Sequence, residues 1–190
     1  MRVIAGKYRS RRLQSLPGLE LRPTADRLRE TLFNVLTAGN PMALQGTVWV
    51  DLYAGTGAVG IEAISRSASM VHFVESSEGA VRLISKNLAS LGIDAGFQIL
   101  KQDSIRALRA LSSNDTVADF IFLDPPYEME EAYRMALETL STSGLLKDES
   151  SVIAEHRKKF DPGEAFGSLR RYRKLVQGEA GLSFYRSAHP

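Results

Sequence analysis

After Gly46, short apolar segments alternate with segments whose apolar residues recur at helical spacing. This alternation predicts strands and helices in turn, and the strands are continuous apolar runs. Strands of that kind are buried on both faces, so we predict an α/β fold with a parallel sheet covered by helices on each side. The predicted strands are 47–52, 70–74, 97–100, 118–123 and one starting at Val152, followed by an antiparallel pair, 171–176 and 182–185. The predicted helices are 58–67, 77–91, 104–111 and 130–140.

The first residues of the chain differ in character from the rest. Residues 1–23 are rich in arginine and lysine and are punctuated by proline turns, which predicts a basic β-hairpin or an extended arm. Thr24 can then cap a helix that ends at Gly39-Asn40-Pro41. We therefore predict an arm at 1–23 and one α/β domain at 24–190.

Charge and composition narrow the classes of function. Residues 1–30 carry a net charge of +5, residues 31–150 carry −7 and residues 151–190 carry +4. The basic ends favour a polyanionic partner, although solvated surface charge would give the same count. The absence of cysteine excludes disulfides and thiolate sites, and the three histidines are not at metal-ligand spacing, so we predict no metal. With no apolar run near the roughly 20 residues that span a bilayer and no secretory signal, we expect a cytoplasmic protein without membrane contact.

A glycine turn joins the first predicted strand to the next helix. Gly55 and Gly57 let the backbone turn sharply beneath a ligand, with helix amides facing it. With Gly60 they also fit the fingerprint of NAD(P)-dependent oxidoreductases, and Glu75 lies where a ribose-binding acid would sit. A tight turn without a ligand is a further alternative. Asp51, at the end of the strand, favours a cationic ammonium or sulfonium ligand over a pyrophosphate, which a carboxylate would repel.

The strand 118–123 ends in Asp124-Pro125-Pro126-Tyr127, at the edge of the sheet where α/β proteins bind ligands. The Asp124 carboxylate and the Pro125 carbonyl can each accept one N–H of an exocyclic amino group, which would aim the nitrogen lone pair at an electrophile. Two successive prolines fix φ and hold that carbonyl in place. Tyr127 offers a flat face to an unstacked base. We predict these four residues to be catalytic, with a polar turn and a packing tyrosine as the structural alternative.

These motifs together make the chain resemble a known family. Asp51–Gly57 (DLYAGTG) and Asp124–Tyr127 (DPPY) resemble the class I S-adenosylmethionine-dependent amino-methyltransferases of nucleic acids. The opening Arg2–Leu13 and the element Leu21–Asn34 are similar to the bacterial 16S ribosomal RNA guanine-N2 methyltransferases of the RsmD type. The resemblance runs over almost the full length of the chain.

The resemblance implies a Rossmann-like, mostly parallel seven-stranded sheet with an N-terminal hairpin extension. It implies S-adenosylmethionine as cofactor and methyl transfer to a guanine N2 amine of 16S rRNA, within the small ribosomal subunit or its assembly intermediate. A monomer is our default expectation. The residues predicted to bind the cofactor are Asp51, Tyr53, Ala54, Gly55, Gly57, Glu75, Ser76, Asp103 and Ser104. Asp103 could instead cap the helix that follows it.

The predicted RNA contacts lie in the basic arm and at the start of the first helix. They are Arg2, Lys7, Arg9, Arg11, Arg12, Arg22, Thr24 and Arg27. The basic segments 156–159 and 170–174 could extend this phosphate track. Ser10 and Ser67 stand where the family usually has glycine, and Ser10 could alter the hairpin turn.

Three other functions stay open at this point. A DNA adenine or cytosine amino-methyltransferase would use the same DPPY segment, although the chain has no separate domain for reading a DNA sequence. An NAD(P)-dependent oxidoreductase would explain the glycine turn and Glu75 but leaves Asp51 and Asp124 without a role. A non-catalytic ribosome-assembly factor would keep the fold and the basic arm.

Overall fold

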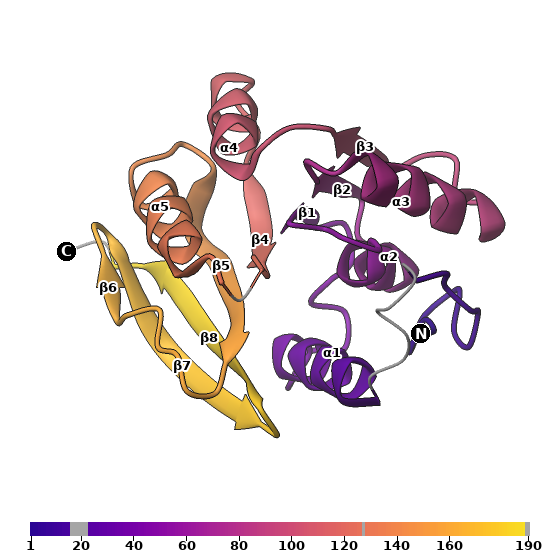
Figure 1. Ribbon diagram of the computed structural model, residues 1–190, viewed down its shortest axis with the longest axis horizontal. Helices are drawn as coiled ribbons and strands as arrows, with labels where there is room; N and C mark the ends of the chain where they lie inside the picture. Colours follow the sequence, from indigo (N-terminus) through magenta and orange to yellow (C-terminus); the bar gives the residue numbers. More distant parts are fainter. Residues whose placement is uncertain (16–22, 127, 189–190) are drawn as a thin grey trace.

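The computed structural model describes residues 1–15, 23–126 and 128–188. An eight-stranded sheet runs through the molecule in the order β3-β2-β1-β4-β5-β8-β7-β6 (Figure 1). The strands are β1 (Val48–Leu52), β2 (Met70–Val74), β3 (Phe97–Leu100), β4 (Ala118–Leu123), β5 (Leu146–Arg157), β6 (Ala165–Phe166), β7 (Leu169–Gln177) and β8 (Ala180–Ser187). The helices are α1 (Pro23–Leu36), α2 (Ala58–Ser65), α3 (Glu78–Ser90), α4 (Ser104–Ser113) and α5 (Glu130–Ser141).

The first five strands of the chain pair with one another in parallel, and the last three join the sheet through antiparallel pairs. Parallel pairs join β3 through β2, β1 and β4 to β5, and β8 and β7 then add antiparallel partners. Chain order reverses between β1 and β4, which is the point where open α/β sheets bind ligands. The predicted closing antiparallel pair is confirmed. The eighth strand, which the sequence did not predict, is the two-residue β6, and β5 begins six residues earlier than expected, at Leu146.

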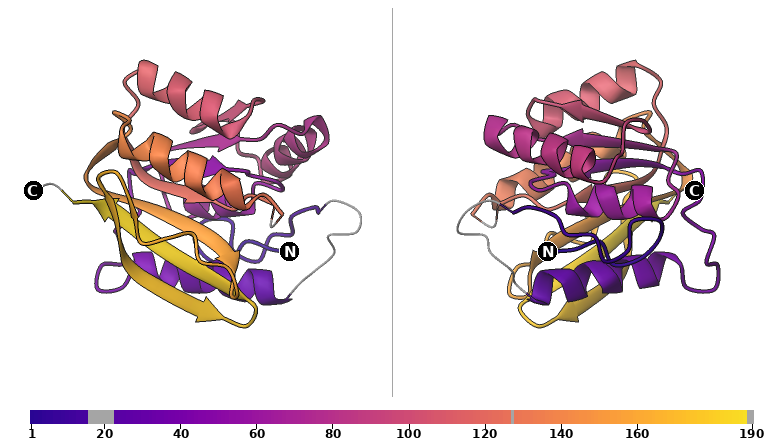
Figure 2. Two further views of the ribbon diagram at one scale, coloured as in Figure 1. Left: turned by 60° about the vertical axis from the view of Figure 1, so that its left-hand side comes forward. Right: turned by 90° about the vertical axis from the view of Figure 1, so that its right-hand side faces the viewer.

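Helices cover both faces of the sheet, as the continuous apolar strands predict. One core packs α1, α2 and α3 against the sheet and includes Trp49 of β1. The other packs α4 and α5 against the opposite face and includes the next residue, Val50. Figure 2 shows α1 on the far side of the sheet from α4 and α5. Because neighbouring residues of a strand point to opposite faces, each strand serves both cores.

The expected N-terminal hairpin is wrong. In the described part of the arm, the pairing is a single bridge between Arg2 and Arg12. The arm instead uses α2 as its partner: Ile4 and Ala5 donate their amides to the Glu62 carboxylate at 2.8 and 3.0 Å. Further along, Lys7 N donates to the Ser65 carbonyl at 2.8 Å. Backbone hydrogen bonds also join the two halves of the arm, from Val3 N to the Arg11 carbonyl and from Ser10 N to the Val3 carbonyl, both at 2.9 Å. Because α2 satisfies other backbone groups of the arm, the described residues there form no strand ladder beyond the bridge.

The two serines that replace expected glycines keep a glycine-like backbone. Ser10 has φ of 66° and Ser67 has φ of 74°, both in the left-handed region. That conformation costs a residue with a Cβ roughly 1–2 kcal/mol, so the turn geometry is retained at some cost in stability. Within the described ranges, no helix has the length and apolar composition needed to cross a bilayer.

Candidate active site at the carboxyl end of the sheet

Two cavities open side by side where the parallel strands end. The first, which we call the acidic cavity, has a volume of about 210 Å³ and is lined by residues that include Asp51, Asp124 and Glu155. The second, the β2–β3 cavity, has a volume of about 240 Å³ and lies at the ends of β2 and β3, with Glu75 in its lining. The Gly55 amide donates to Glu75 at 2.9 Å, which links the linings of the two cavities.

Strand register brings the three acids of the acidic cavity together. β1 pairs with β4, and β4 pairs with β5, all in parallel. Leu123 of β4 pairs with Ala154 of β5, so Asp124 and Glu155 follow as neighbours one residue further along. Asp51, Asp124 and Glu155 each come two residues after a core residue of the face covered by α1, α2 and α3. Residues two apart on a strand share a face, so all three acids project toward that side.

Burial and mutual repulsion disfavour the charged forms of these acids. Burial raises the pKa of Asp51 to about 8, although its carboxylate accepts the Gly60 amide at 2.9 Å. Burial likewise raises the pKa of Asp124 to about 7. The pKa of Glu155 lies well above its usual value because of burial and the nearby Asp124, while Arg29 opposes the shift. A cationic ligand would relieve this repulsion, so the cavity is built for positive charge.

The side chains of Asp124 and Glu155 have unused hydrogen-bonding capacity. None of the residues that the structure describes donates a hydrogen bond to either carboxylate. Both side chains are half-buried, and a carboxylate can accept several hydrogen bonds. Donors from a ligand would therefore complete this pair.

Arg29 supplies a positive charge to the lining of the acidic cavity. It is only 5% exposed and its Nη2 donates to the Arg2 carbonyl at 2.6 Å and to Asp26 at 3.1 Å. Its Nε lies 4.0 Å from Glu62 and, among the described residues, makes no hydrogen bond. The guanidinium thereby connects α1, the arm and the cavity.

Glu155 and Arg29 were not predicted from the sequence as residues of the site. Glu155 directly follows the buried apolar run Val152–Ala154, where an acid is unexpected. Arg29 lies next to Leu28 and three residues before Leu32, both buried, so it is a charge on the apolar face of α1. A charged residue on a face predicted to be buried is the signal that could have found both.

In the β2–β3 cavity, polar groups of the loops are held by hydrogen bonds. The two Glu75 oxygens accept from Gly55 N at 2.9 Å and Ser77 N at 2.8 Å. The Tyr53 hydroxyl lies 2.7 Å from Ser104 Oγ. Asp103 caps α4 by accepting the Arg106 amide at 3.0 Å, as its alternative interpretation predicts. The carboxylate of Glu75 keeps lone pairs for further donors.

The predicted cofactor and catalytic residues divide between the two cavities. Asp51, Ala54, Gly55 and Asp124 line the acidic cavity. The β2–β3 cavity is lined by Tyr53, Glu75, Ser76, Asp103, Ser104 and Pro126. Pro125 is buried and lines neither. Gly57 also lines neither cavity; it precedes α2 at φ 76°, where an added Cβ would lie 3.3 Å from Ile84. Tyr127 lies outside the described residues.

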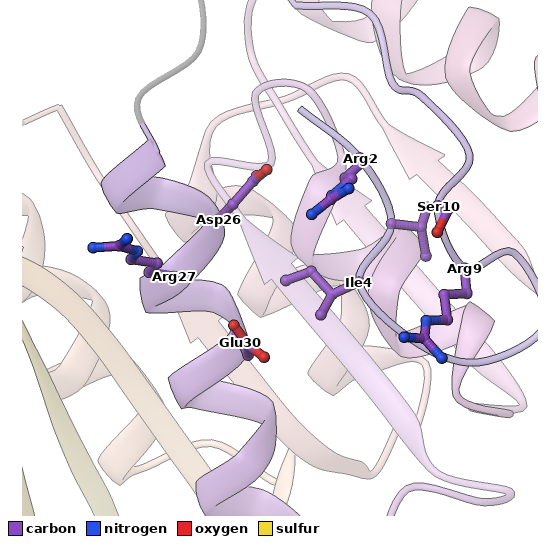
Figure 3. Close-up of a pocket in the computed structure, with 8 residues that line it drawn as sticks. Arg2, Ile4, Arg9, Ser10, Asp26, Arg27 and Glu30 are labelled. Carbon is purple, nitrogen blue, oxygen red and sulfur yellow. The ribbon is translucent and has the colours of Figure 1, made fainter.

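Three of the predicted RNA contacts lie in one groove. Arg2, Arg9 and Arg27 line a hollow of about 440 Å³ together with Asp26 and Glu30. Figure 3 shows the arm on one side of this groove and α1 on the other. We call it the arm groove.

The other predicted RNA contacts are more scattered. Lys7, Arg11 and Arg12 are exposed on the arm, and Arg11 donates to the Ser90 carbonyl at 3.1 Å. Thr24 lies in the first turn of α1, and Arg22 is outside the described residues.

In the basic segments 156–159 and 170–174, several side chains already have partners within the protein. His156 is fully buried, with Nε2 2.9 Å from Ser183 Oγ, so it belongs to the core. Arg171 and Lys174 form ion pairs with Asp161 at 2.5 and 2.7 Å. These pairs hold the pKa of the Asp161 carboxyl below its usual range. The two basic side chains therefore already have a carboxylate partner.

Known proteins are similar to this chain over almost its whole length. The family model described as "Conserved hypothetical protein 95" matches residues 1–186. YlbH of Bacillus subtilis is 33% identical over 186 residues, covering 98% of each chain. "Ribosomal RNA small subunit methyltransferase D" of Escherichia coli K12 is 31% identical over 189 residues, covering 98% of this chain and 89% of that protein. The solved structure of yhhF from Escherichia coli matches with a TM-score of 0.81 and 26% identity, covering 98% of this chain and 97% of that one.

Proposed function

From the premise that the chain belongs to the conserved hypothetical protein 95 family, we propose that it methylates the N2 amine of a guanine in 16S ribosomal RNA. The protein is an S-adenosylmethionine-dependent methyltransferase, and the names of its relatives support rRNA as the substrate. The choice of guanine N2 and of 16S rRNA is the proposed part. It is supported by the named relative in Escherichia coli and by the chemistry of the acidic cavity.

The two cavities fit the cofactor. When bound, S-adenosylmethionine supplies a methyl group on a positively charged sulfur, which is already a strong electrophile. Asp51 in the acidic cavity suits the cationic half of the molecule, because the clustered acids there favour positive charge. Glu75 suits the ribose hydroxyls and Asp103 an adenine amino group, both from the β2–β3 cavity.

The observation that carries the proposal is the Asp124 carboxylate in the acidic cavity, which no described residue engages with a hydrogen bond. An exocyclic amine is a poor nucleophile, because its lone pair is delocalised into the ring. Asp124 can accept one of its N–H groups from the cavity and turn the lone pair toward the electrophile. The backbone carbonyl of Pro125, the next residue in the chain but not in the cavity lining, is the proposed acceptor of the second N–H. Such pre-positioned acceptors act mainly by orientation and electrostatics.

The arm groove is the proposed path of the RNA. Arg29 lines the acidic cavity, and its donation to the Arg2 carbonyl ties the cavity to the groove. Exposed Arg2 and Arg9 can contact phosphates while a base reaches the acids. The oxidoreductase alternative would place a pyrophosphate near Asp51 and Asp124, which would repel it.

Methyl transfer from radiolabelled S-adenosylmethionine tests this function. The acceptors are small ribosomal subunits from cells that lack the enzyme, with DNA as a parallel acceptor. We expect label in the 16S rRNA, and mass spectrometry should locate it as N2-methylguanosine. Label in DNA, on adenine or on cytosine would contradict the proposal. Tight binding to subunits without any transfer would instead support the assembly-factor alternative.

A further inference from the structure

We propose that Glu155 selects guanine by accepting the ring N1–H while the neighbouring Asp124 accepts an N–H of the adjoining N2 amine. The inference rests on the proposed function and gives it a second substrate-binding residue. Neither the DPPY segment nor the glycine turn contains this residue.

The first step is the placement of the two carboxylates. Asp124 and Glu155 follow the paired residues Leu123 and Ala154 on neighbouring parallel strands, and both line the acidic cavity. β5 lies inside the sheet between β4 and β8, and Glu155 itself pairs with Leu182 of β8. The Glu155 carbonyl also accepts a hydrogen bond from the Tyr133 hydroxyl at 2.8 Å. Its backbone is therefore held firmly beside that of Asp124.

The second step is the chemistry of the bases. Guanine presents two adjacent kinds of donor on one edge, the ring N1–H and the N2 amine. Adenine and cytosine carry their amines next to an unprotonated ring nitrogen, which is an acceptor. Two carboxylates side by side therefore match guanine. With adenine or cytosine, the second carboxylate would face a lone pair, and an unpaired buried polar group is costly.

The third step is the charge of Glu155. The ionised form accepts the guanine N1–H, whereas a protonated Glu155 would donate to the ring nitrogen of adenine or cytosine. Burial and Asp124 raise the pKa of Glu155, and Arg29 in the lining of the same cavity opposes that shift. A cationic ligand beside the acids would act in the same direction as Arg29 and favour the ionised form. The guanidinium is thus part of the selection, although it need not touch the base.

The fourth step is that Glu155 has no other visible partner for its side chain. Among the described residues, no donor is hydrogen-bonded to its carboxylate. The side chain is half-buried in the lining of the acidic cavity, so its lone pairs are open to a donor from a ligand. The N1–H on the edge of guanine supplies this donor.

The test compares guanine with 2-aminopurine at the mapped target nucleotide, in small subunits reconstituted with each RNA. 2-Aminopurine keeps the 2-amine, but its ring N1 is an acceptor. We expect the wild-type protein to prefer guanine in kcat/KM by on the order of 10- to 100-fold, the discrimination typical of a two-point base contact. Glu155→Gln presents an amide that can donate to the 2-aminopurine N1, so the preference should collapse or invert.

Two controls separate selection from stability. Glu149→Gln is the matched control, because Glu149 lies on the same strand and is exposed; it should keep the wild-type preference. The binding of S-adenosylhomocysteine and the thermal unfolding of each variant report whether the fold is intact. Should Glu155→Gln not fold, equal rates for the two bases with the wild-type protein would still overturn the selection by Glu155.

The outcomes distinguish this inference from the proposed function. If the wild-type protein methylates guanine and 2-aminopurine equally, or if Glu155→Gln lowers both rates by the same factor, Glu155 does not select the base. In that case the proposed function stands. If the wild-type protein methylates adenine or cytosine instead, the proposed function fails and the selection fails with it.

Discussion

Two groups of acids in this molecule differ in burial and in what donates to them: Glu62 is fully buried, whereas Asp124 and Glu155 are half-buried. Glu62 of α2 is fully buried and accepts the amides of Ile4 and Ala5 and the Arg66 Nε, the last at 2.8 Å. Asp124 and Glu155, at the carboxyl end of β4 and β5, accept no hydrogen bond from a described residue. Glu62 holds the arm against α2, whereas the other two acids face a cavity.

The donors around a carboxylate distinguish a structural acid from a functional one. A buried carboxylate is tolerated when donors surround it, and it then contributes to stability. A half-buried carboxylate at a cavity that lacks protein donors adds little to stability, and its lone pairs are available to a ligand. The contrast predicts that changes at Glu62 act mainly on folding and that changes at Asp124 act mainly on activity.

The largest expected effect is at Asp124. Asp124→Asn keeps the shape of the side chain but replaces one acceptor by a donor that opposes the substrate amine. We expect kcat to fall by roughly 10²- to 10³-fold, the usual loss for one pre-organised electrostatic contact. S-Adenosylhomocysteine binding, measured by calorimetry, should change little, and the free energy of unfolding should not fall. Turnover near that of the wild-type protein would show that Asp124 is not the amine acceptor.

Glu62→Ala is expected to act on stability instead. It leaves two arm amides and Arg66 without their acceptor, so the free energy of unfolding in urea should fall by about 3 kcal/mol. Hydrogen exchange at Ile4 and Ala5 should also become faster. Glu78→Ala on α3 is the control, because its ion pairs with Arg82 and Lys101 are exposed and should contribute nothing measurable. Equal stability of both variants would remove the contrast.

The pH dependence of the wild-type protein sharpens the comparison. Asp51 and Asp124 have pKa values of about 8 and about 7 in the folded protein, above their ordinary value of 3.8. The folded state therefore binds more protons than the unfolded state, and the free energy of unfolding should fall as pH rises from about 4 to about 8. Activity should move the other way, because Asp124 accepts hydrogen bonds when ionised. We expect kcat/KM to be about tenfold lower at pH 6 than on its alkaline plateau. A flat profile for both quantities would contradict the raised pKa values.

The smallest expected effect is at the exposed cations of the arm. Lys7→Ala and Arg9→Ala should each reduce the slope of log K for RNA binding against log salt by about 0.7–0.9, one phosphate contact apiece. The melting temperature should not change, because both side chains are exposed. Arg109→Ala, an exposed cation on α4 on the other face of the sheet, should leave the slope unchanged. An equal effect of all three would mean that the arm has no special role in binding RNA.

Most of the fold could be predicted from local pattern. The predicted strands 70–74, 97–100 and 118–123 match the observed ones residue for residue, because a continuous apolar run marks a central parallel strand. The prediction of a hairpin at the N-terminus was wrong, because Glu62 and Ser65, which hold the arm, lie more than 50 residues away in the sequence. Local turns and charges carry no information on such a distant acceptor.

Features whose chemistry is contained in a short segment could be predicted from the amino-acid sequence. The alternation of elements, the glycine turn beside Asp51 and the Asp124-Pro125 pair belong to this class, since neighbours in the chain supply all that they need. Only the tertiary structure decided which acids are satisfied and which are open to a ligand. The pairing of β4 with β5 placed Glu155 beside Asp124, and the packing of α1 brought in Arg29. Burial and hydrogen-bond partners set the properties of a charged group, and both are contributed by elements that are far apart in the chain.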